Sequence, residues 1–321
     1  MAAHPVISDT PVPGSEEKPV ESDGLSWFTR TKFMFVRGFL WGLAVCFGLG
    51  GLYHFGRFFG TCEWLVNHKR RRRFRKRLGA TLGDHVKEMS CSMTYACWQH
   101  FVRTRCDKLL YLIFDKIPRE EIIRRTTFHR RELIDNALER GKGLYVCMSH
   151  NGSHHVLIQI MAMLGYRIAG VRDRNEGAMR RYIQEKYEQS FPELRAVRMF
   201  FADSYPRDLY RCFQEGYILG TALDVSRLRA SHLRTAKVKI FGEEREFLTG
   251  TMQIALRCKV PVLQGFVVSR DNFYFDLIPL DGLVDPDKAE DTPEVLQQAM
   301  QRYADNIGCH LLKYPDHYSR V

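Results

Sequence analysis

The sequence predicts an α/β fold with a mostly parallel central sheet, preceded by an N-terminal hydrophobic helix. From residue 141 onward, short apolar segments of strand length alternate with helical segments. Strands that are separated by crossover helices pair in a largely parallel sheet covered by helices. Ahead of this region, residues 38–53 form an uncharged stretch rich in glycine and aromatic side chains. The 321 residues are enough for one large domain or two small ones, with a core that needs no disulfides.

Residues 1–25 are predicted to form a disordered tail. They contain several acidic residues, lack aromatic side chains, and include the prolines Pro5, Pro11, Pro13 and Pro19. Such a composition buries too little apolar surface to offset the entropy of folding. The segment does not resemble a secretory signal, because no basic start leads directly into an apolar stretch with a small-residue cleavage site.

A membrane-embedded helix is predicted over residues 33–60. Residues 38–53 are sixteen residues without a charge, slightly fewer than the ~20 that cross a bilayer. Either the helix spans the membrane while Arg37 reaches to the interface, or the helix is re-entrant or lies in the interface. A buried helix of a soluble protein is less favoured, because aromatic side chains stand among the glycines here.

Residues 61–140 are predicted to be a basic juxtamembrane and helical segment. Eight of the ten residues 68–77 are basic, namely Lys69, Arg70, Arg71, Arg72, Arg73, Arg75, Lys76 and Arg77. With a net charge of +11, the chain suits an anionic partner. Such a run binds nucleic acid or anionic lipid, where each basic residue near the surface contributes about 1 kcal/mol. The neighbouring hydrophobic stretch favours anionic membrane lipids over nucleic acid, and the positive-inside rule then places the remaining chain in the cytoplasm.

The nine cysteines show no spacing typical of a disulfide framework or a metal site. Several lie in apolar stretches, as Cys147 and Cys258 do. We therefore expect reduced, buried thiols in a reducing compartment, which agrees with a cytoplasmic location.

The region 141–321 is predicted to be the α/β core. Strands are expected over residues 143–148, 166–171, 197–201, 218–223, 262–268 and, at the edge, 274–278. Helices are expected over residues 154–164, 174–190, 209–215, 250–258 and 292–312. Between residues 78 and 140 the apolar side chains cluster on faces, which predicts amphipathic helices.

His150 is a candidate site residue because it directly follows a predicted strand, in the loop that opens the next helix. Open α/β sheets bind their ligands at the carboxyl ends of strands. Asn151, Gly152 and Ser153 suit a tight turn and a helix cap. A single histidine at a strand end is more often structural than catalytic, so this position alone assigns no function.

Several segments together resemble one family, the bacterial lipid A biosynthesis acyltransferases. The strongest runs from Gly141 to His150, where the family has a glycine, an apolar strand and a catalytic histidine. The others are Val171-Arg172, Leu209 through Gly216, Ala222-Leu-Asp224, Phe241-Gly242, Thr249-Gly250-Thr251, Val260-Pro-Val262 and Tyr314-Pro-Asp-His-Tyr318. Each segment alone is weak, whereas their order and spacing over roughly residues 35–318 are specific. The resemblance implies a glycerolipid-acyltransferase-like α/β sandwich.

The resemblance also implies a membrane-associated O-acyltransferase on the cytoplasmic face of the inner membrane. Such an enzyme moves a fatty acyl chain from an acyl carrier protein or coenzyme A thioester to a hydroxyl of a lipid A precursor or a related membrane lipid, without a cofactor. His150 is then the general base, and backbone N–H groups after Asn151 stabilise the oxyanion.

The same resemblance implies three substrate-binding residues, Asn151, Arg172 and Asp224. Arg172 would hold a phosphate through its guanidinium fork, and Asp224 would orient a polar partner in the cleft. The simpler alternatives are a surface salt bridge for Arg172 and a helix cap or loop acid for Asp224.

One departure from the family pattern concerns mechanism. The family has a carboxylate that polarises the catalytic histidine, and the matching position here is His155, which carries no negative charge at neutral pH. Three options remain open: His155 orients His150 as a neutral acceptor, Asp173 or Asp224 replaces the carboxylate, or the chain is an inactive lipid-binding or assembly protein with the same fold. A metal bound by the histidines at 150, 154 and 155 is not favoured, because no carboxylate or thiolate ligand is near. The sequence names neither the acceptor lipid nor the acyl chain length.

Overall fold

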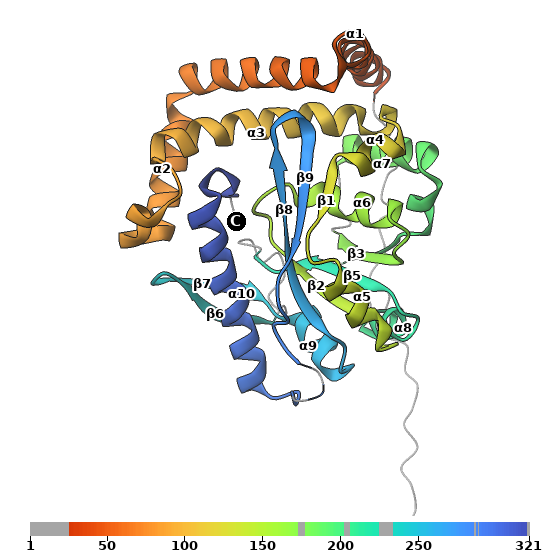
Figure 1. The fold of residues 1–321 in the computed structure, drawn as a ribbon, viewed down its shortest axis with the longest axis vertical. Coiled ribbons are helices and arrows are strands. Elements are labelled where there is room, and N and C mark those ends of the chain that lie inside the picture. Colours follow the sequence, from red (N-terminus) through yellow and green to blue (C-terminus); the bar gives the residue numbers. More distant parts are fainter. Residues whose placement is uncertain are drawn as a thin grey trace, which may run out of the picture.

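The computed structural model describes residues 26–172, 177–201, 206–224, 234–285, 287 and 289–319. The predicted tail over residues 1–25 lies outside these residues. Figure 1 shows a central sheet covered by helices and a long bent helix, α1, across one end of it. The strands of this sheet occur in the order β1-β9-β8-β2-β5-β3-β4, and a separate pair, β6 and β7, forms a hairpin.

The elements have the following bounds. The strands are β1 (Thr126–Phe128), β2 (Leu144–Met148), β3 (Ile168–Arg172), β4 (Arg198–Phe201), β5 (Ile218–Ala222), β6 (Thr235–Ile240), β7 (Glu243–Leu248), β8 (Val262–Arg270) and β9 (Tyr274–Pro279). The α-helices are α1 (Trp27–Val66), α2 (His68–Leu82), α3 (Met93–Ile113), α4 (Arg119–Arg124), α5 (Glu132–Glu139), α6 (Leu157–Met163), α7 (Ala178–Ser190), α8 (Pro206–Gln214), α9 (Gly250–Arg257) and α10 (Pro293–Lys313).

The prediction of a mostly parallel sheet is confirmed. β2 lies between β5 and β8 and runs parallel to both, while β3 runs parallel to β4 and β5. Among the described strands of this sheet, β8 and β9 form the antiparallel pair. Each of the six predicted strands is present within a few residues of its expected bounds. The predicted edge position of residues 274–278 is wrong, because β1 pairs with β9 on its outer side.

Sequence reasoning misses the hairpin of β6 and β7. Its first strand alternates exposed and buried residues, as a strand with one face on the core should. Phe241 and Gly242 form the turn, with φ angles of 53° and 116°. Because hairpin turns with positive φ usually carry Asn-Gly or Asp-Gly, a phenylalanine there hides the turn from the sequence.

The central strand β2 is buried along its whole length because helices cover both faces of the sheet. Tyr145 and Cys147 belong to a core that includes residues of α2, α9 and α10. Val146 and Met148 point the other way, into a core shared with α1, α3 and α6. Successive side chains of a strand alternate between faces, so this one strand ties the two cores together and holds the loop that follows it.

Helix α1 bends at Gly48, whose φ of 67° and ψ of 178° interrupt the helical backbone. Beyond the bend, α1 runs along α3 (Figure 1). A Cβ atom at Gly60 would lie 2.6 Å from the Cα atom of Val102, and one at Gly56 would lie 2.9 Å from Cys106 Sγ. The two glycines therefore allow the backbones of α1 and α3 to approach closely.

Before the bend, Arg37 fastens α1 to the rest of the domain. Its guanidinium donates to Asp115 Oδ2 at 2.6 Å and to the carbonyl oxygen of Leu112 at 2.7 Å, and the residue is 6% exposed. The interpretation in which Arg37 reaches to the membrane interface is therefore wrong. A carboxylate and a carbonyl oxygen inside the protein satisfy the charge instead.

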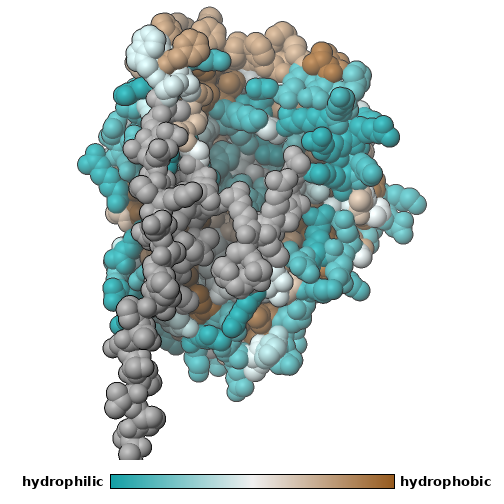
Figure 2. Space-filling view, turned by 180° about the vertical axis from the view of Figure 1, so that it is seen from behind, coloured by the Kyte–Doolittle hydropathy of each residue, from teal (hydrophilic) through white to brown (hydrophobic). Residues whose placement is uncertain are grey.

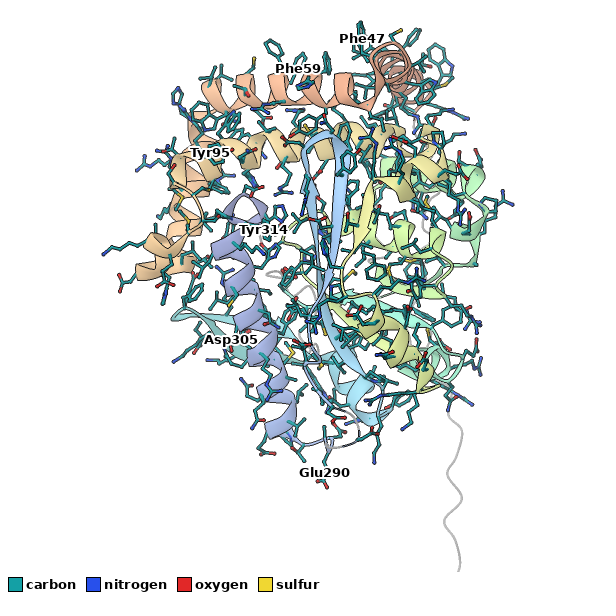
Figure 3. All side chains as sticks on the ribbon, viewed as in Figure 1. Phe47, Phe59, Tyr95, Glu290, Asp305 and Tyr314 are labelled. Atoms are coloured by element: carbon teal, nitrogen blue, oxygen red, sulfur yellow. The ribbon has the colours of Figure 1, made fainter. Side chains whose placement is uncertain are left out.

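The outer face of α1 is apolar over both of its halves. The side chains exposed there are Trp27, Phe28, Met34, Phe35, Val36, Phe39, Val45, Phe47, Phe58, Phe59, Leu65 and Val66. Figure 2 shows hydrophobic surface gathered along this end of the molecule, above a mostly hydrophilic face, and Figure 3 shows Phe47 and Phe59 pointing away from the domain. By length and composition, α1 is the described helix able to cross a membrane.

Candidate active site

His150 and Asp224 meet because their strands are parallel neighbours. Met148, the last residue of β2, pairs with Ala222, the last residue of β5, so the next two residues of each strand leave the sheet side by side. His150 Nδ1 lies 2.9 Å from Asp224 Oδ1. The backbone N–H of His150 also donates to both carboxylate oxygens, at 3.1 and 3.0 Å.

Two neighbours in the same loop complete the binding of the Asp224 carboxylate. Ser149 Oγ donates to Asp224 Oδ2 at 2.7 Å. Asn151 Nδ2 donates to Ser149 Oγ at 2.7 Å and, more weakly, to Asp224 Oδ2 at 3.4 Å. Asp224 is 1% exposed, and a carboxylate so deeply buried keeps its charge only where donors surround it.

Tyr303 of α10 fixes both strand ends from the other side of the sheet. Its hydroxyl donates to the carbonyl oxygen of Met148 at 2.6 Å and accepts from the backbone N–H of Leu223 at 3.4 Å. The fully buried Tyr303 side chain thus joins the two strand ends just before His150 and Asp224.

The imidazole of His150 is arranged to accept a proton. Burial lowers its pKa, but the hydrogen bond and the charge of Asp224 outweigh burial, so the pKa of His150 is raised above its usual value. With Nδ1–H donated to Asp224, the lone pair belongs to Nε2. The tautomer with a free lone pair on Nε2 is the one that a general base needs. The His150 side chain is 36% exposed and lines a cleft of about 620 Å³.

His154 and His155 line the same cleft as neutral imidazoles. Burial, and then the neighbouring His150 and His155, lower the pKa of His154 to about 3. Burial also lowers the pKa of His155, whose ring stands edge-on to Tyr111. Within the described chain no hydrogen bond joins His155 to His150, whereas Asp224 contacts His150 directly. Asp173 lies outside the described residues.

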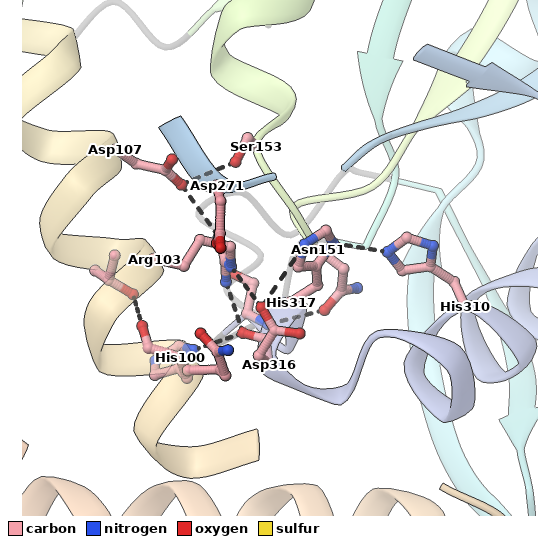
Figure 4. Close-up of polar contacts among 12 residues, drawn as sticks. His100, Arg103, Asp107, Asn151, Ser153, Asp271, His310, Asp316 and His317 are labelled. Carbon is pink, nitrogen blue, oxygen red and sulfur yellow. Dashed lines mark hydrogen bonds and ion pairs between the residues drawn. The ribbon is translucent and has the colours of Figure 1, made fainter. Parts of the chain in front are cut away.

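The loop that carries His150 is held by segments far from it in sequence, as Figure 4 shows. The backbone N–H of Gly152 donates to the carbonyl oxygen of His317 at 3.0 Å, and the N–H of Ser319 donates to Asn151 Oδ1 at 2.8 Å. Ser153 Oγ donates to Asp107 Oδ2 at 2.8 Å. Gly152 is required here, because a Cβ atom would lie 2.5 Å from the carbonyl oxygen of Val267.

Arg103 connects this C-terminal segment to helix α3. Its guanidinium donates to Asp316 Oδ2 at 3.2 Å, to the carbonyl oxygen of Asp316 at 2.7 Å and to Asp107 Oδ2 at 3.2 Å. Nearby, His310 Nε2 lies 3.1 Å from His317 Nδ1, and burial lowers the pKa of both imidazoles well below the usual value. These histidines are therefore neutral supports of the loop.

The structure brings some predicted site residues together and leaves others apart. His150, Asn151 and Asp224 form one hydrogen-bonded group, and His155 lies in the same cleft. The side chain of Arg172 lies outside the described residues. Sequence reasoning does not find four residues that support the loop of His150, namely Ser149, Asp107, Arg103 and His317. The one signal for them in the sequence is the match of Tyr314-Pro-Asp-His-Tyr318 to the family.

A family model described as bacterial lipid A biosynthesis acyltransferase matches residues 25–315 of the chain. The chain belongs to this acyltransferase family. Membership implies acyltransferase activity, with an acyl donor and a lipid acceptor in general, and it confirms the resemblance noted in the sequence. No curated protein matches the chain significantly.

Replacement of Asp224 by asparagine should lower the pKa of His150. Asparagine keeps the size of the side chain but removes the charge that raises this pKa, so the effect of burial prevails. NMR titration of ¹³C-labelled histidine in detergent micelles measures the change. Asp276→Asn, which removes a buried carboxylate beside His129, is the control and should leave the pKa of His150 unchanged. An unchanged pKa in Asp224→Asn would contradict the assigned pairing.

Proposed function

We propose that the chain is an O-acyltransferase that moves a fatty acyl chain from an acyl carrier protein or coenzyme A thioester to a hydroxyl of a lipid A precursor or a related membrane lipid. The observation that carries this proposal is the His150–Asp224 pair, with Nδ1 and Oδ1 2.9 Å apart at the edge of an open cleft. Because Asp224 offers the carboxylate that position 155 lacks, acyl transfer is favoured over an inactive lipid-binding protein.

In the proposed reaction, His150 Nε2 removes the proton of the acceptor hydroxyl as that oxygen attacks the thioester carbonyl carbon. Asp224 holds the imidazole in the required tautomer and stabilises the imidazolium that forms. The tetrahedral intermediate then collapses, the C–S bond breaks, and His150 returns the proton to the leaving thiolate. The products are the ester and the free thiol, and no other reactant is consumed.

The backbone N–H groups of residues 151–153 are not available to bind the oxyanion. The sequence predicts N–H groups after Asn151 for this role, but those of residues 151, 152 and 153 already donate to Ser149 Oγ, to the carbonyl oxygen of His317 and to that of Val267. They are not free for a substrate oxygen. Both ends of the Asn151 side-chain amide are also hydrogen-bonded within the protein, Nδ2 to Ser149 and Oδ1 to Ser319. We therefore assign Asn151 to the support of the loop and not to substrate binding.

Neutral His154 is the donor that we assign to the oxyanion. Its ring centroid lies 5.0 Å from that of His150, and its Nδ1 atom is buried without a partner. Because a buried N–H without an acceptor is rarer than a buried acceptor without a donor, the proton belongs on Nε2. A neutral imidazole N–H can stabilise an oxyanion, as a histidine of low pKa does in triosephosphate isomerase.

We further propose that α1 lies in the interface of the inner membrane, with the α/β core on the cytoplasmic side. The aromatic outer face of α1 suits lipid. Its inner face packs against α3 at Gly56 and Gly60, and Arg37 pairs with Asp115 in the 3₁₀ turn after α3. The exposed cations of the neighbouring helix α2 suit anionic headgroups.

Replacement of His150 by alanine should lower the rate of acyl transfer by about 10²–10⁴-fold, because the general base is lost. The assay follows a radiolabelled acyl group from acyl carrier protein or coenzyme A to a membrane lipid extract. His85→Ala, which removes an exposed histidine of the 3₁₀ turn after α2, is the control and should retain wild-type activity. An unchanged rate in His150→Ala would refute the proposed mechanism.

Replacement of His154 by alanine should lower kcat by about 10²–10³-fold with little change in KM, because the donor acts on the oxyanion and less on the bound substrate. Glutamine, which keeps an N–H donor, should recover part of kcat. Equal loss in both variants, or a loss confined to KM, would show that His154 has another role.

Replacement of Phe35 or Phe39 by glutamate should release the protein from lipid vesicles, since a charge would then lie in the apolar face of α1. Co-flotation with vesicles containing anionic lipid measures binding. Gln298→Glu adds the same charge to an exposed position of α10 and should float like the wild type. Flotation of the Phe35 and Phe39 variants at the wild-type level would contradict the proposed membrane face.

A further inference from the structure

The basic helix α2 presents two different faces. Of its eight basic residues, Arg70, Arg73 and Arg77 line the same cleft as His150, and the other five do not. Spacings of three and four residues put these arginines on one side of the helix. Phe74, which lies on this side between them, is buried against His100 and Tyr318. The orientation of α2 is thus set by packing, with one row of cations turned toward the catalytic cleft.

The cleft carries an excess of positive charge. Its described lining contains five cationic side chains and one carboxylate, namely Arg70, Arg73, Arg77, Arg103, Lys108 and Asp107. The histidines that line it, apart from His150, have lowered pKa values and are neutral. Such a concave cationic surface concentrates anions.

Two of the cations are already neutralised inside the protein. Arg70 lies 2.5 Å from Glu63 Oε1 and over the ring of Phe101, and Arg103 contacts the carboxylates of Asp107 and Asp316. Asp107 is in turn occupied by Arg103 and Ser153. Asp107, the one carboxylate of the described lining, therefore does not neutralise the remaining cations of the cleft.

Arg73, Arg77 and Lys108 are the remaining cations, and none of them forms an ion pair with a described residue. Burial, followed by the charges of Arg70 and Arg105, lowers the pKa of Lys108, as expected where like charges are gathered. Arg73 and Arg77 are four residues apart on one face of α2, so their guanidinium groups can reach one anion together. Guanidinium forks match the oxygens of a phosphate, and two forks suit its double charge, while Lys108 adds to the positive potential of the cleft.

We propose that Arg73 and Arg77 form a phosphate-binding site in the wall of the catalytic cleft. The site holds a phosphate group of the acyl acceptor or of the acyl donor while the hydroxyl or the thioester reaches His150. This inference rests on the proposed acyl transfer and deepens it, because it assigns part of the basic segment to substrate and leaves the remainder to the membrane surface.

The test compares two double variants of α2 that lose the same charge. Arg73→Ala/Arg77→Ala removes the cleft pair, and Arg72→Ala/Lys76→Ala removes a pair, also four residues apart, that does not line the cleft. The cleft variant should raise KM at least about 10–100-fold for the phosphate-bearing substrate, since the loss of even one hydrogen bond to a charged group costs about 1.5–3 kcal/mol. Assayed in non-ionic detergent micelles, where no anionic surface is present, the control variant should change KM by less than about threefold, as exposed charges contribute little.

The source of the phosphate is identified by omitting it from one substrate at a time. If the acceptor supplies it, a dephosphorylated acceptor should abolish the difference between wild type and cleft variant. If the donor supplies it, an acyl-N-acetylcysteamine thioester, which has no phosphate, should abolish it. A difference that persists with neither phosphate present would overturn the proposal. So would equal effects of the two double variants on KM and on vesicle flotation, which would assign the whole helix to the membrane surface.

A binding measurement separates this proposal from the proposed activity. Calorimetric titration with inorganic pyrophosphate should show binding to the wild type and to the control variant, with at least about tenfold weaker binding to the cleft variant. This result supports the site even if no acyl transfer is detected. Arg73→Lys/Arg77→Lys, which keeps the charge, guards against loss of folding and should bind with intermediate affinity. Equal pyrophosphate binding by the wild type and both alanine variants would refute the site.

Discussion

The geometry of the loop after β2 depends on one buried carboxylate. Asp224 accepts hydrogen bonds from the hydroxyl of Ser149, from the backbone N–H and Nδ1 of His150, and from the amide of Asn151. An uncompensated charge at 1% exposure would destabilise the fold by several kcal/mol. The same donors that stabilise the charge are thereby fixed in place, so the position of the imidazole follows from a requirement of folding.

Much of the fold could be predicted from the sequence, because strands and crossover helices leave a strong pattern. The pairing of His150 with Asp224 could not. After β2 the next strand along the chain is β3, yet β5 lies between them in the sheet. A single sequence contains no signal for that order. Without the strand order, the distance between residues 150 and 224 cannot be predicted. Asp224 could be proposed as a candidate, but its contact required the strand order.

Other parts of the site escaped prediction for local reasons. The run of cations over residues 68–77 hides the helical period, since residues on every face carry the same charge. Phe74 is the exception, and its burial shows which side of α2 faces the domain. Arg37 was expected near lipid because it flanks an apolar stretch, but the partner that buries it, Asp115, is 78 residues away. Contacts of this kind depend on tertiary packing and leave no local pattern.

The hydrogen bond between Ser319 and Asn151 can form only late in the synthesis of the chain. The two residues are 168 positions apart, and at 5–20 residues per second ribosomes need roughly 10–30 s to add the intervening chain. Until residues 317–319 leave the ribosome, the loop after β2 lacks its hydrogen bonds to His317 and Ser319. The apolar face of α1 and the cations of α2 therefore leave the ribosome well before the loop after β2 is complete.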